Sequence, residues 1–316
     1  MMKLISIVTP CFNEEQNVEA VYQQVKDVII SLPEYRFEHI FIDNSSSDHS
    51  VEILKELASK DPNLKIIVNI RNFGHIRSPF YGILQSKGDA AILIVSDLQD
   101  PPSLIKDFIK KWEEGYKIVI GIKEKSEENK LMFLIRKAFY YFIRKFSDEG
   151  DLIDNFIGFG LYDKIVIDKF REIKDPYLYF RGFISDTGFE RAEFKYHQKK
   201  RVWGRSKNKF VNLYDTAISG LVQHSRALLR MASLIGFSTG FLCFIISLVY
   251  LVYKLLFWSN FTVGIAPLVI GIFFFFSLLL IFIGLLGEYI NAILLRVKNY
   301  PAVYEQERIN FEKNEN

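Results

Sequence analysis

The chain has 316 residues, of which 49% are hydrophobic and 15% aromatic, and its formal net charge is +3. This length suits one large domain with an accessory region. The charge is too small to indicate nucleic-acid binding, so no nucleic-acid partner is expected. Cys11 and Cys243 lie far apart in the sequence, which argues against a structural disulfide and fits a reducing compartment.

Short apolar runs alternate with amphipathic segments over the first part of the chain. Strands are expected at 4–10, 39–44, 64–70, 90–97 and 117–123. Helices are expected at 14–30, 50–60 and 79–86, with a further one opened by Pro101 and Pro102. Such alternation predicts an α/β fold whose Rossmann-like, mostly parallel sheet is covered by helices on both faces. We assign this domain to residues 1–230.

Polar side chains stand where three of the expected strands end. Asn13, which is expected to cap the following helix, and Glu14 come after the first strand. Asp43 ends the second strand and Asp97 ends the fourth. Because ligands of open α/β sheets bind beyond the carboxyl ends of the strands, these residues predict a binding site at that edge.

The segment SDLQDPP at 96–102 is rich in oxygen ligands, which are supplied by Asp97, Gln99 and Asp100. Mg²⁺ or Mn²⁺ held by one or two carboxylates would neutralise the charge of a diphosphate leaving group. Simpler alternatives stay open at this point. Asp97 is then a helix-capping residue without a metal, and Asp43 is a turn-forming residue.

Two long stretches near the C-terminal end carry no charge. Twenty-three uncharged residues lie between Arg230 and Lys254, and 33 lie between Lys254 and Glu288. Since about 20 apolar residues cross the hydrocarbon core as a helix, we predict two transmembrane helices, at 231–253 and 263–287, that form a hairpin within residues 231–288. A buried hairpin in the core of the domain is the alternative.

Basic residues flank the predicted hairpin on one side, at Arg226, Arg230, Arg296 and Lys298. Flanking positive charge favours the cytoplasmic side of a membrane. We therefore expect a multi-pass protein of the inner (plasma) membrane. Its domain 1–230 and its tail 289–316 would both lie on the cytoplasmic face.

Seven motifs occur in order, namely PCFNEE (10–15), FIDNSSSD (41–48), RNFG (71–74), SDLQDPP (96–102), FRG (180–182), GRSK (204–207) and GEYI…RVKNYPAVY (287–304). Together they resemble the polyprenyl-phosphate glycosyltransferases of glycosyltransferase family 2, such as dolichol-phosphate mannose synthase and the bactoprenol glucosyl transferases. The resemblance implies a GT-A catalytic domain and a homo-oligomer. It also implies inverting transfer of a sugar from a nucleotide-diphosphate sugar to polyprenyl (undecaprenyl) phosphate for cell-envelope glycosylation. Glucose and UDP are the default sugar and nucleotide.

The resemblance also assigns roles to individual residues. Nucleotide-sugar binding falls to Pro10, Asn13, Glu14, Asp43, Asp97, Gln99 and Ser206. The metal ligands are Asp97 and Gln99, and the catalytic residues are Asp97, Arg201 and Lys207. Lys123 and Arg136 are candidate cations for the acceptor phosphate. The segment that Arg136 opens is expected either at the membrane interface or as a helix packed on the sheet.

Three positions depart from the family pattern. Val95 stands where the family has a first aspartate of its metal motif, Asn44 replaces the second aspartate of DDGS, and Gly158 replaces a later aspartate. Two rival functions stay open, and these departures support the second of them. One is a processive polysaccharide synthase, although the residues around Arg201 read QxxRxW and not QxxRW. The other is a non-catalytic membrane scaffold that descends from the enzyme.

Overall fold

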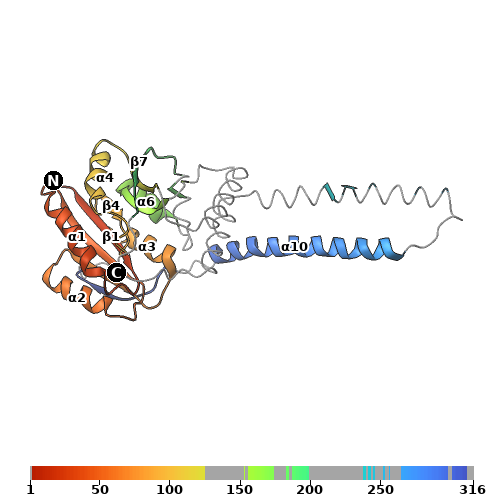
Figure 1. Ribbon diagram of the computed structural model, residues 1–316, viewed down its shortest axis with the longest axis horizontal. Coiled ribbons are helices and arrows are strands. Elements are labelled where there is room, and N and C mark those ends of the chain that lie inside the picture. The colour runs from red at the N-terminus through yellow and green to blue at the C-terminus, as the bar shows by residue number, and fades with distance from the viewer. Residues whose placement is uncertain are drawn as a thin grey trace.

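The computed structural model describes residues 2–124, 153, 156–173, 183–184, 187–198, 238–239, 241–242, 245, 252, 256, 265–297 and 301–311. Within these ranges one eight-stranded sheet forms the centre of the globular part of the molecule, with the strand order β7-β5-β6-β4-β1-β2-β3-β8 (Figure 1). Its strands are β1 (Leu4–Cys11), β2 (Arg36–Asp43), β3 (Leu64–Asn69), β4 (Ala90–Leu93), β5 (Ile118–Lys123), β6 (Phe156–Asp163), β7 (Arg191–Tyr196) and β8 (Glu305–Ile309).

The sheet is mixed, with a parallel centre. Strand β1 lies between β2 and β4 and runs parallel to both, β2 is parallel to β3, and β5 is parallel to β7. Strand β6 runs antiparallel between β4 and β5, and β8 runs antiparallel along β3. The prediction of a mostly parallel sheet is therefore confirmed for its central strands, and β6, β7 and β8 are additions that the sequence did not predict.

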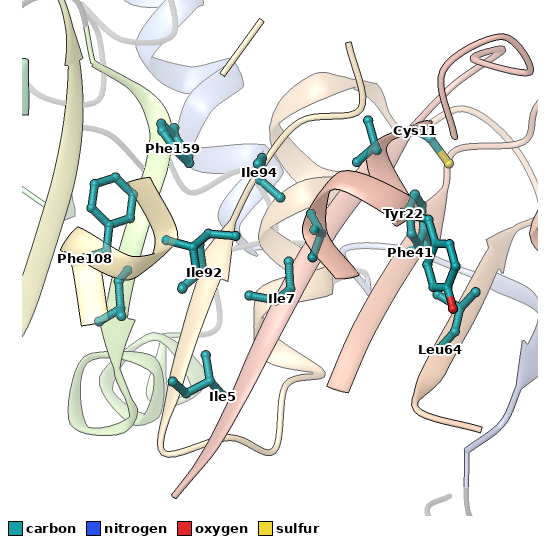
Figure 2. Packing of buried hydrophobic residues seen from close by; sticks show 14 of the residues in the cluster. Ile5, Ile7, Cys11, Tyr22, Phe41, Leu64, Ile92, Ile94, Phe108 and Phe159 are labelled. Atoms are coloured by element: carbon teal, nitrogen blue, oxygen red, sulfur yellow. The ribbon is translucent and has the colours of Figure 1, made fainter. Parts of the chain in front are cut away.

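Helices cover both faces of the sheet, as predicted. The helices are α1 (Val18–Ile30), α2 (Ser50–Lys60), α3 (Gly74–Leu84), α4 (Leu104–Glu113), α6 (Lys164–Glu172) and α10 (Ile265–Val297). One core joins α1, α2 and α4 to the face of β1 that carries Ile5 and Ile7 (Figure 2). A second core joins α3 and α6 to the opposite face, where Val8 points. The alternation along β1 is the period of two that a strand imposes on its side chains.

Helix α1 begins later than the sequence suggested, and Asn13 does not cap it. Asn13 has a positive φ of 53°, and its side-chain oxygen accepts a hydrogen bond from the backbone N–H of Ser47 at 2.7 Å. Asn17 occupies the N-cap position without a side-chain capping bond. The cap was predicted wrongly because the Asn13 side chain instead links the β1–α1 loop to the turn that follows β2.

Two further elements differ from the predicted bounds. Helix α3 begins at Gly74, five residues before the expected start, and contains Pro79 within it. Strand β4 ends at Leu93, although the N–H of Ile94 still donates to the carbonyl of Val8 at 3.0 Å. Asp97 therefore lies in the loop beyond β4 and not at its last residue.

Helix α10 has 33 residues and extends away from the sheet domain (Figure 1). Large apolar side chains are exposed along its length, among them Leu268, Ile272, Phe276, Leu279, Ile283, Leu286, Ile290 and Ile293. Among the helices in the described part of the chain, none meets the length and hydropathy expected of a membrane span. Most of the first predicted span, 231–253, lies outside the described residues.

The segment that follows α10 returns to the sheet and forms its last strand. The N–H of Ile70 donates to the carbonyl of Tyr304 at 3.0 Å. Arg308 of β8 contacts Glu305 and donates to the side-chain oxygen of Gln85 at 2.7 Å. The side-chain amide of Asn310 donates to backbone carbonyls at the end of α2 and the start of β3. Part of the predicted tail 289–316 is thus built into the domain.

Candidate active site

The structure places the polar residues that follow β1 and β2 at one edge of the sheet. Cys11 and Asp43 are neighbours in the register of β1 and β2. Beyond them, the hydroxyl of Ser46 accepts from the N–H of Asn13 at 2.8 Å and donates to Asp43. Ser46 therefore joins two residues that the sequence had assigned to nucleotide binding. Pro10 lies half-buried on β1, directly before Cys11.

The loops that leave β1 and β2 are also joined to each other further along. The N–H of Glu14 donates to the hydroxyl of Ser50 at 2.9 Å, and the Glu14 carboxylate accepts from the side-chain amide of Asn17 at 2.5 Å. Both loops hold a non-glycine residue at positive φ, at Asn13 and at Ser45. Such backbone is uncommon and clusters at functional sites, which fits this edge as a binding site.

Asp43 has no exposed surface. Burial raises the pKa of its carboxyl, against which hydrogen bonds from Ser46 and from Cys11 favour the charged form. Burial beside Asp43 also raises the pKa of the Cys11 thiol well above its ordinary value, so this thiol stays protonated. A ligand therefore contacts the Asp43 carboxylate only after a local rearrangement.

A second polar cluster lies in the loop beyond β4. Asp97 is half-buried, and its Oδ1 accepts from the N–H of Gln99 at 3.1 Å. The side-chain oxygen of Gln99 accepts from the amide of Gln198, which follows β7, at 3.2 Å. The next residue of the loop, Asp100, is buried and accepts from the hydroxyl of Tyr196 at 2.5 Å.

Asp100 is the buried carboxyl of this cluster. Burial raises its pKa to about 6, against the Tyr196 hydrogen bond and the positive charge of Lys123. Its Oδ2 has no hydrogen-bond partner within the described part of the chain. Tyr196 and Gln198 were not predicted as site residues. They directly precede the basic stretch that contains Arg201. No spacing in the sequence links them to Asp100 and Gln99.

The residues of this loop suit a metal ion that is bound partly by protein side chains and partly by a ligand. They do not supply a full set of protein ligands. Among the described residues, no group of three histidine, cysteine or acidic side chains is placed to hold a metal ion. Mg²⁺ is commonly bound by one or two carboxylates together with water and substrate phosphates. The half-buried carboxylate of Asp97 and the orphaned buried oxygen of Asp100 suit such a partial site.

Lys123 is the last residue of β5 and pairs in register with Tyr196 of β7. Its charge acts on Asp100, so the structure associates Lys123 with the loop beyond β4. The other predicted cations and their neighbour, Arg136, Arg201, Ser206 and Lys207, lie outside the described residues.

Comparison with known proteins now adds to this geometry. Residues 6–171, just over half of the chain, match the family model described as Glycosyl transferase family 2. The chain belongs to this family. The resemblance inferred from the seven motifs is thereby confirmed, and the protein is a glycosyltransferase.

Relatives of this glycosyltransferase match over nearly its whole length. It is similar to the uncharacterized glycosyltransferase YkcC of Bacillus subtilis, with 32% identity over 310 residues that cover 97% of this chain and 94% of the relative. It is also similar to the SfII prophage-derived bactoprenol glucosyl transferase of Shigella flexneri, with 31% identity over 298 residues that cover 94% and 96%.

A solved structure supports the fold. Mannosyl-3-phosphoglycerate synthase from Rubrobacter xylanophilus aligns with a TM-score of 0.50 at 13% identity and covers 74% of this chain and 75% of its own. The sheet of this family 2 glycosyltransferase is therefore a GT-A-like mixed α/β sheet, as the motifs implied.

One family departure has a clear structural basis in this glycosyltransferase. Gly158 of β6 has a positive φ of 103°, and its carbonyl accepts from the hydroxyl of Tyr162 at 2.6 Å. Such a backbone conformation strains any residue with a Cβ. An aspartate at this position would therefore require a different local path of β6.

Proposed function

We propose that this glycosyltransferase moves a sugar, glucose by default, from a UDP-sugar to a polyprenyl phosphate such as undecaprenyl phosphate. The observation that carries the proposal is the similarity to the bactoprenol glucosyl transferase of Shigella flexneri, which spans more than nine-tenths of both chains. The polar clusters after β1, β2 and β4 support it, because they lie at one edge of the sheet.

The loop beyond β4 is the proposed binding place of the donor diphosphate. Asp97, with Gln99, would hold Mg²⁺ or Mn²⁺, and such a metal neutralises charge on the leaving diphosphate. Lys123 adds a positive charge near Asp100. The proposed catalytic residues Arg201 and Lys207, together with Ser206, would complete the phosphate contacts.

The acceptor explains why a strong general base is not required. A phosphate monoester oxygen is already anionic at neutral pH, whereas a sugar hydroxyl must lose a proton as it attacks. The protein then contributes alignment of the phosphate oxygen with the anomeric carbon and stabilisation of the leaving diphosphate. We assign the acceptor phosphate to Arg136 and Lys123.

We further propose that residues 231–287 hold the enzyme at the cytoplasmic face of the inner membrane as a homo-oligomer. The two uncharged stretches, which only Lys254 separates, and the exposed apolar side chains of α10 support membrane anchoring. The topology test is cysteine labelling in oriented vesicles. In a Lys55→Cys variant, the new cysteine at this exposed position should react with a labelling reagent added from the cytoplasmic side only. Reaction with a reagent added from the outer side would contradict this orientation.

The activity test is a screen of nucleotide-sugars with undecaprenyl phosphate, with lipid products measured by mass spectrometry. We expect one hexose per lipid from UDP-glucose, and loss of product when divalent metal is chelated. A polymeric product would favour the processive synthase instead. A folded protein that binds none of UDP-glucose, UDP-N-acetylglucosamine, UDP-aminoarabinose or GDP-mannose would favour the scaffold.

A further inference from the structure

Asn44, which directly follows the nucleotide-site candidate Asp43, stands where the family pattern expects an aspartate. It is 6% exposed and lies at the point where β2 ends. Its side chain does not face solvent or a ligand but the loop between β3 and α3. This loop, residues 70–73, carries the RNF part of the RNFG motif.

All the hydrogen-bonding capacity of the Asn44 side chain is used within this loop and the end of β3. Its amide nitrogen donates to Asn72 Oδ1 at 2.9 Å and to the carbonyl of Gly74 at 3.2 Å. Its oxygen accepts from the N–H of Phe73 at 2.8 Å and from the side-chain amide of Asn69 at 3.2 Å. Two donated and two accepted bonds exhaust what an asparagine side chain offers.

The partners fix which side-chain atom is nitrogen and which is oxygen. The carbonyl of Gly74 can only accept, and the N–H of Phe73 can only donate, so the Asn44 amide cannot be flipped. Asn72 is fixed in the same way, because its Oδ1 also accepts from the N–H of Gly74 at 2.7 Å. An ionised aspartate at position 44 would face two acceptors that cannot reorient into donors.

The loop is also held from its other side. Ile70 donates its N–H to Tyr304, and the rings of Phe73 and Tyr304 lie 6.3 Å apart. Within the loop, the guanidinium of Arg71 lies 4.3 Å from the centre of the Phe73 ring. The conformation of the loop is therefore set by Asn44 on the side of Asp43 and by the C-terminal segment on the other.

We propose that Asn44 is a positioning residue that holds the β3–α3 loop as one wall of the site for the nucleotide part of the donor. The proposal rests on the function proposed above. It assigns Asn44 to nucleotide affinity and not to the transfer step, because its contacts reach the loop beside Asp43 and not the loop of Asp97. The replacement of the family aspartate by Asn44 is then accommodated by its contacts with Asn72 and Gly74, and is not a sign of lost activity.

The test compares Asn44→Asp with the wild-type full-length protein in detergent, with UDP as the calorimetric probe. We expect UDP to bind about tenfold more weakly at pH 7.5, as for the loss of one to two hydrogen bonds. The KM for the donor should rise by a similar factor while kcat stays within about twofold. Affinity should recover as the pH falls toward the carboxyl pKa, because a protonated aspartate can again donate a hydrogen bond.

Two further variants separate positioning from folding. Asn63→Asp makes the same chemical change at an exposed turn before β3 and should keep wild-type affinity. Asn72→Ala removes Asn72 Oδ1, the acceptor of the Asn44 amide, from the exposed side of the loop. It therefore tests the same contact even if Asn44→Asp does not fold. We expect Asn72→Ala to weaken UDP binding as well. Wild-type UDP affinity in a folded Asn44→Asp or Asn72→Ala protein overturns the inference. A wild-type protein that does not bind UDP overturns the proposed function itself.

Discussion

At the scale of single residues, three carboxylates near the carboxyl edge of the sheet differ in their surroundings. Asp43 is buried and bonded to Ser46. Asp100 is buried and bonded to Tyr196. Asp97 is half-buried. Among these three, Asp97 is therefore the carboxylate that a diffusing diphosphate and its metal can reach without rearrangement, whereas Asp43 and Asp100 are buried and hydrogen-bonded within the loops around it.

The first prediction follows from this difference. Asp97→Asn keeps the shape and the acceptor for the Gln99 N–H but removes the charge. We expect kcat to fall by at least about a hundredfold, as when one charge-stabilising group is lost, with little change in the melting temperature. The assay is transfer from UDP-glucose to undecaprenyl phosphate. Asp107→Asn, on the exposed side of α4, is the control, and wild-type turnover by Asp97→Asn would remove Asp97 from the catalytic residues.

Sequence patterns predicted a site at the carboxyl edge of the sheet, but they did not predict the contacts among its residues. The positions of Asp43 and Asp97 follow from where apolar strands end, which local periodicity reveals. The bonds between Tyr196 and Asp100, or between Asn44 and Asn72, join residues far apart in the chain. Such contacts depend on strand order and loop conformation, and a single sequence carries no local signal of either.

At the scale of elements, α3 lies unusually close to the sheet. A Cβ added to Gly82 would lie 2.8 Å from Cγ1 of Val8 and 3.1 Å from Cγ2 of Ile42. The small residue lets the helix approach β1 and β2, and α3 begins at the loop that Asn44 holds. The packing of α3 therefore contributes to the placement of the β3–α3 loop.

The second prediction is that Gly82→Ala destabilises the domain. Overpacking costs about 1–3 kcal/mol, and the better helix propensity of alanine offsets up to about 1 kcal/mol of it. A net loss of about 1 kcal/mol is expected in the free energy of unfolding. Gly271→Ala in α10 makes the same change where no atom lies within 4 Å of the new Cβ and should not destabilise. Equal stability of the two variants would contradict close packing at Gly82.

The third prediction concerns the pairing of β1 and β2. Burial lowers the pKa of His39 to about 3, and His39 shares a hydrogen bond of 2.9 Å with Thr9. The unfolded chain binds a proton at this histidine below about pH 6.5, whereas the native state does not. Stability therefore falls as the pH drops below about 6.5, and this contribution reaches about 2 kcal/mol at pH 5.

Denaturant unfolding of the wild type and of His39→Gln at pH 7 and pH 5 measures this contribution. The wild type should lose about 2 kcal/mol more than the variant between the two pH values. An equal loss in both proteins would mean that His39 titrates alike in the native and unfolded states.

The strands that sequence patterns missed have weak local signals. Strand β6 contains Gly158 and Gly160, which lower strand propensity. Strand β7 lies among charged residues, and β8 has the sequence EQERI with a single apolar residue. These strands form because neighbouring strands supply backbone hydrogen bonds to them, which is a tertiary effect that overrides propensity.

At the scale of the whole molecule, the C-terminal segment links α10 to the catalytic domain. Strand β8 covers the edge of β3 that would otherwise present unpaired backbone groups. Arg77 donates to the carbonyl of Pro301 at 3.2 Å, and the hydroxyl of Tyr81 donates to Glu305 at 2.7 Å. Since both partners belong to α3, the segment after α10 is fixed beside the β3–α3 loop.

The last prediction tests whether this attachment contributes to stability. Asn310 has a positive φ of 60°, and its side chain donates to the carbonyls of Ala58 and Leu64 at 2.9 and 2.8 Å. Asn310→Ala removes both bonds and places alanine in a left-handed conformation, so we expect a loss of about 2 kcal/mol. Asn310→Gly removes the bonds without the strain and should lose about 1 kcal/mol.

Glu307→Ala, in the strand β8 that directly precedes Asn310, is the control. Its ion pair with Lys55 is short, at 2.6 Å, but both side chains are 44% exposed, and exposed pairs contribute about 0–1 kcal/mol. The midpoint of thermal unfolding should therefore fall in the order Asn310→Ala, then Asn310→Gly, then Glu307→Ala, with the largest fall first. If both Asn310 variants melt like the wild type, β8 rests on the sheet edge without stabilising it.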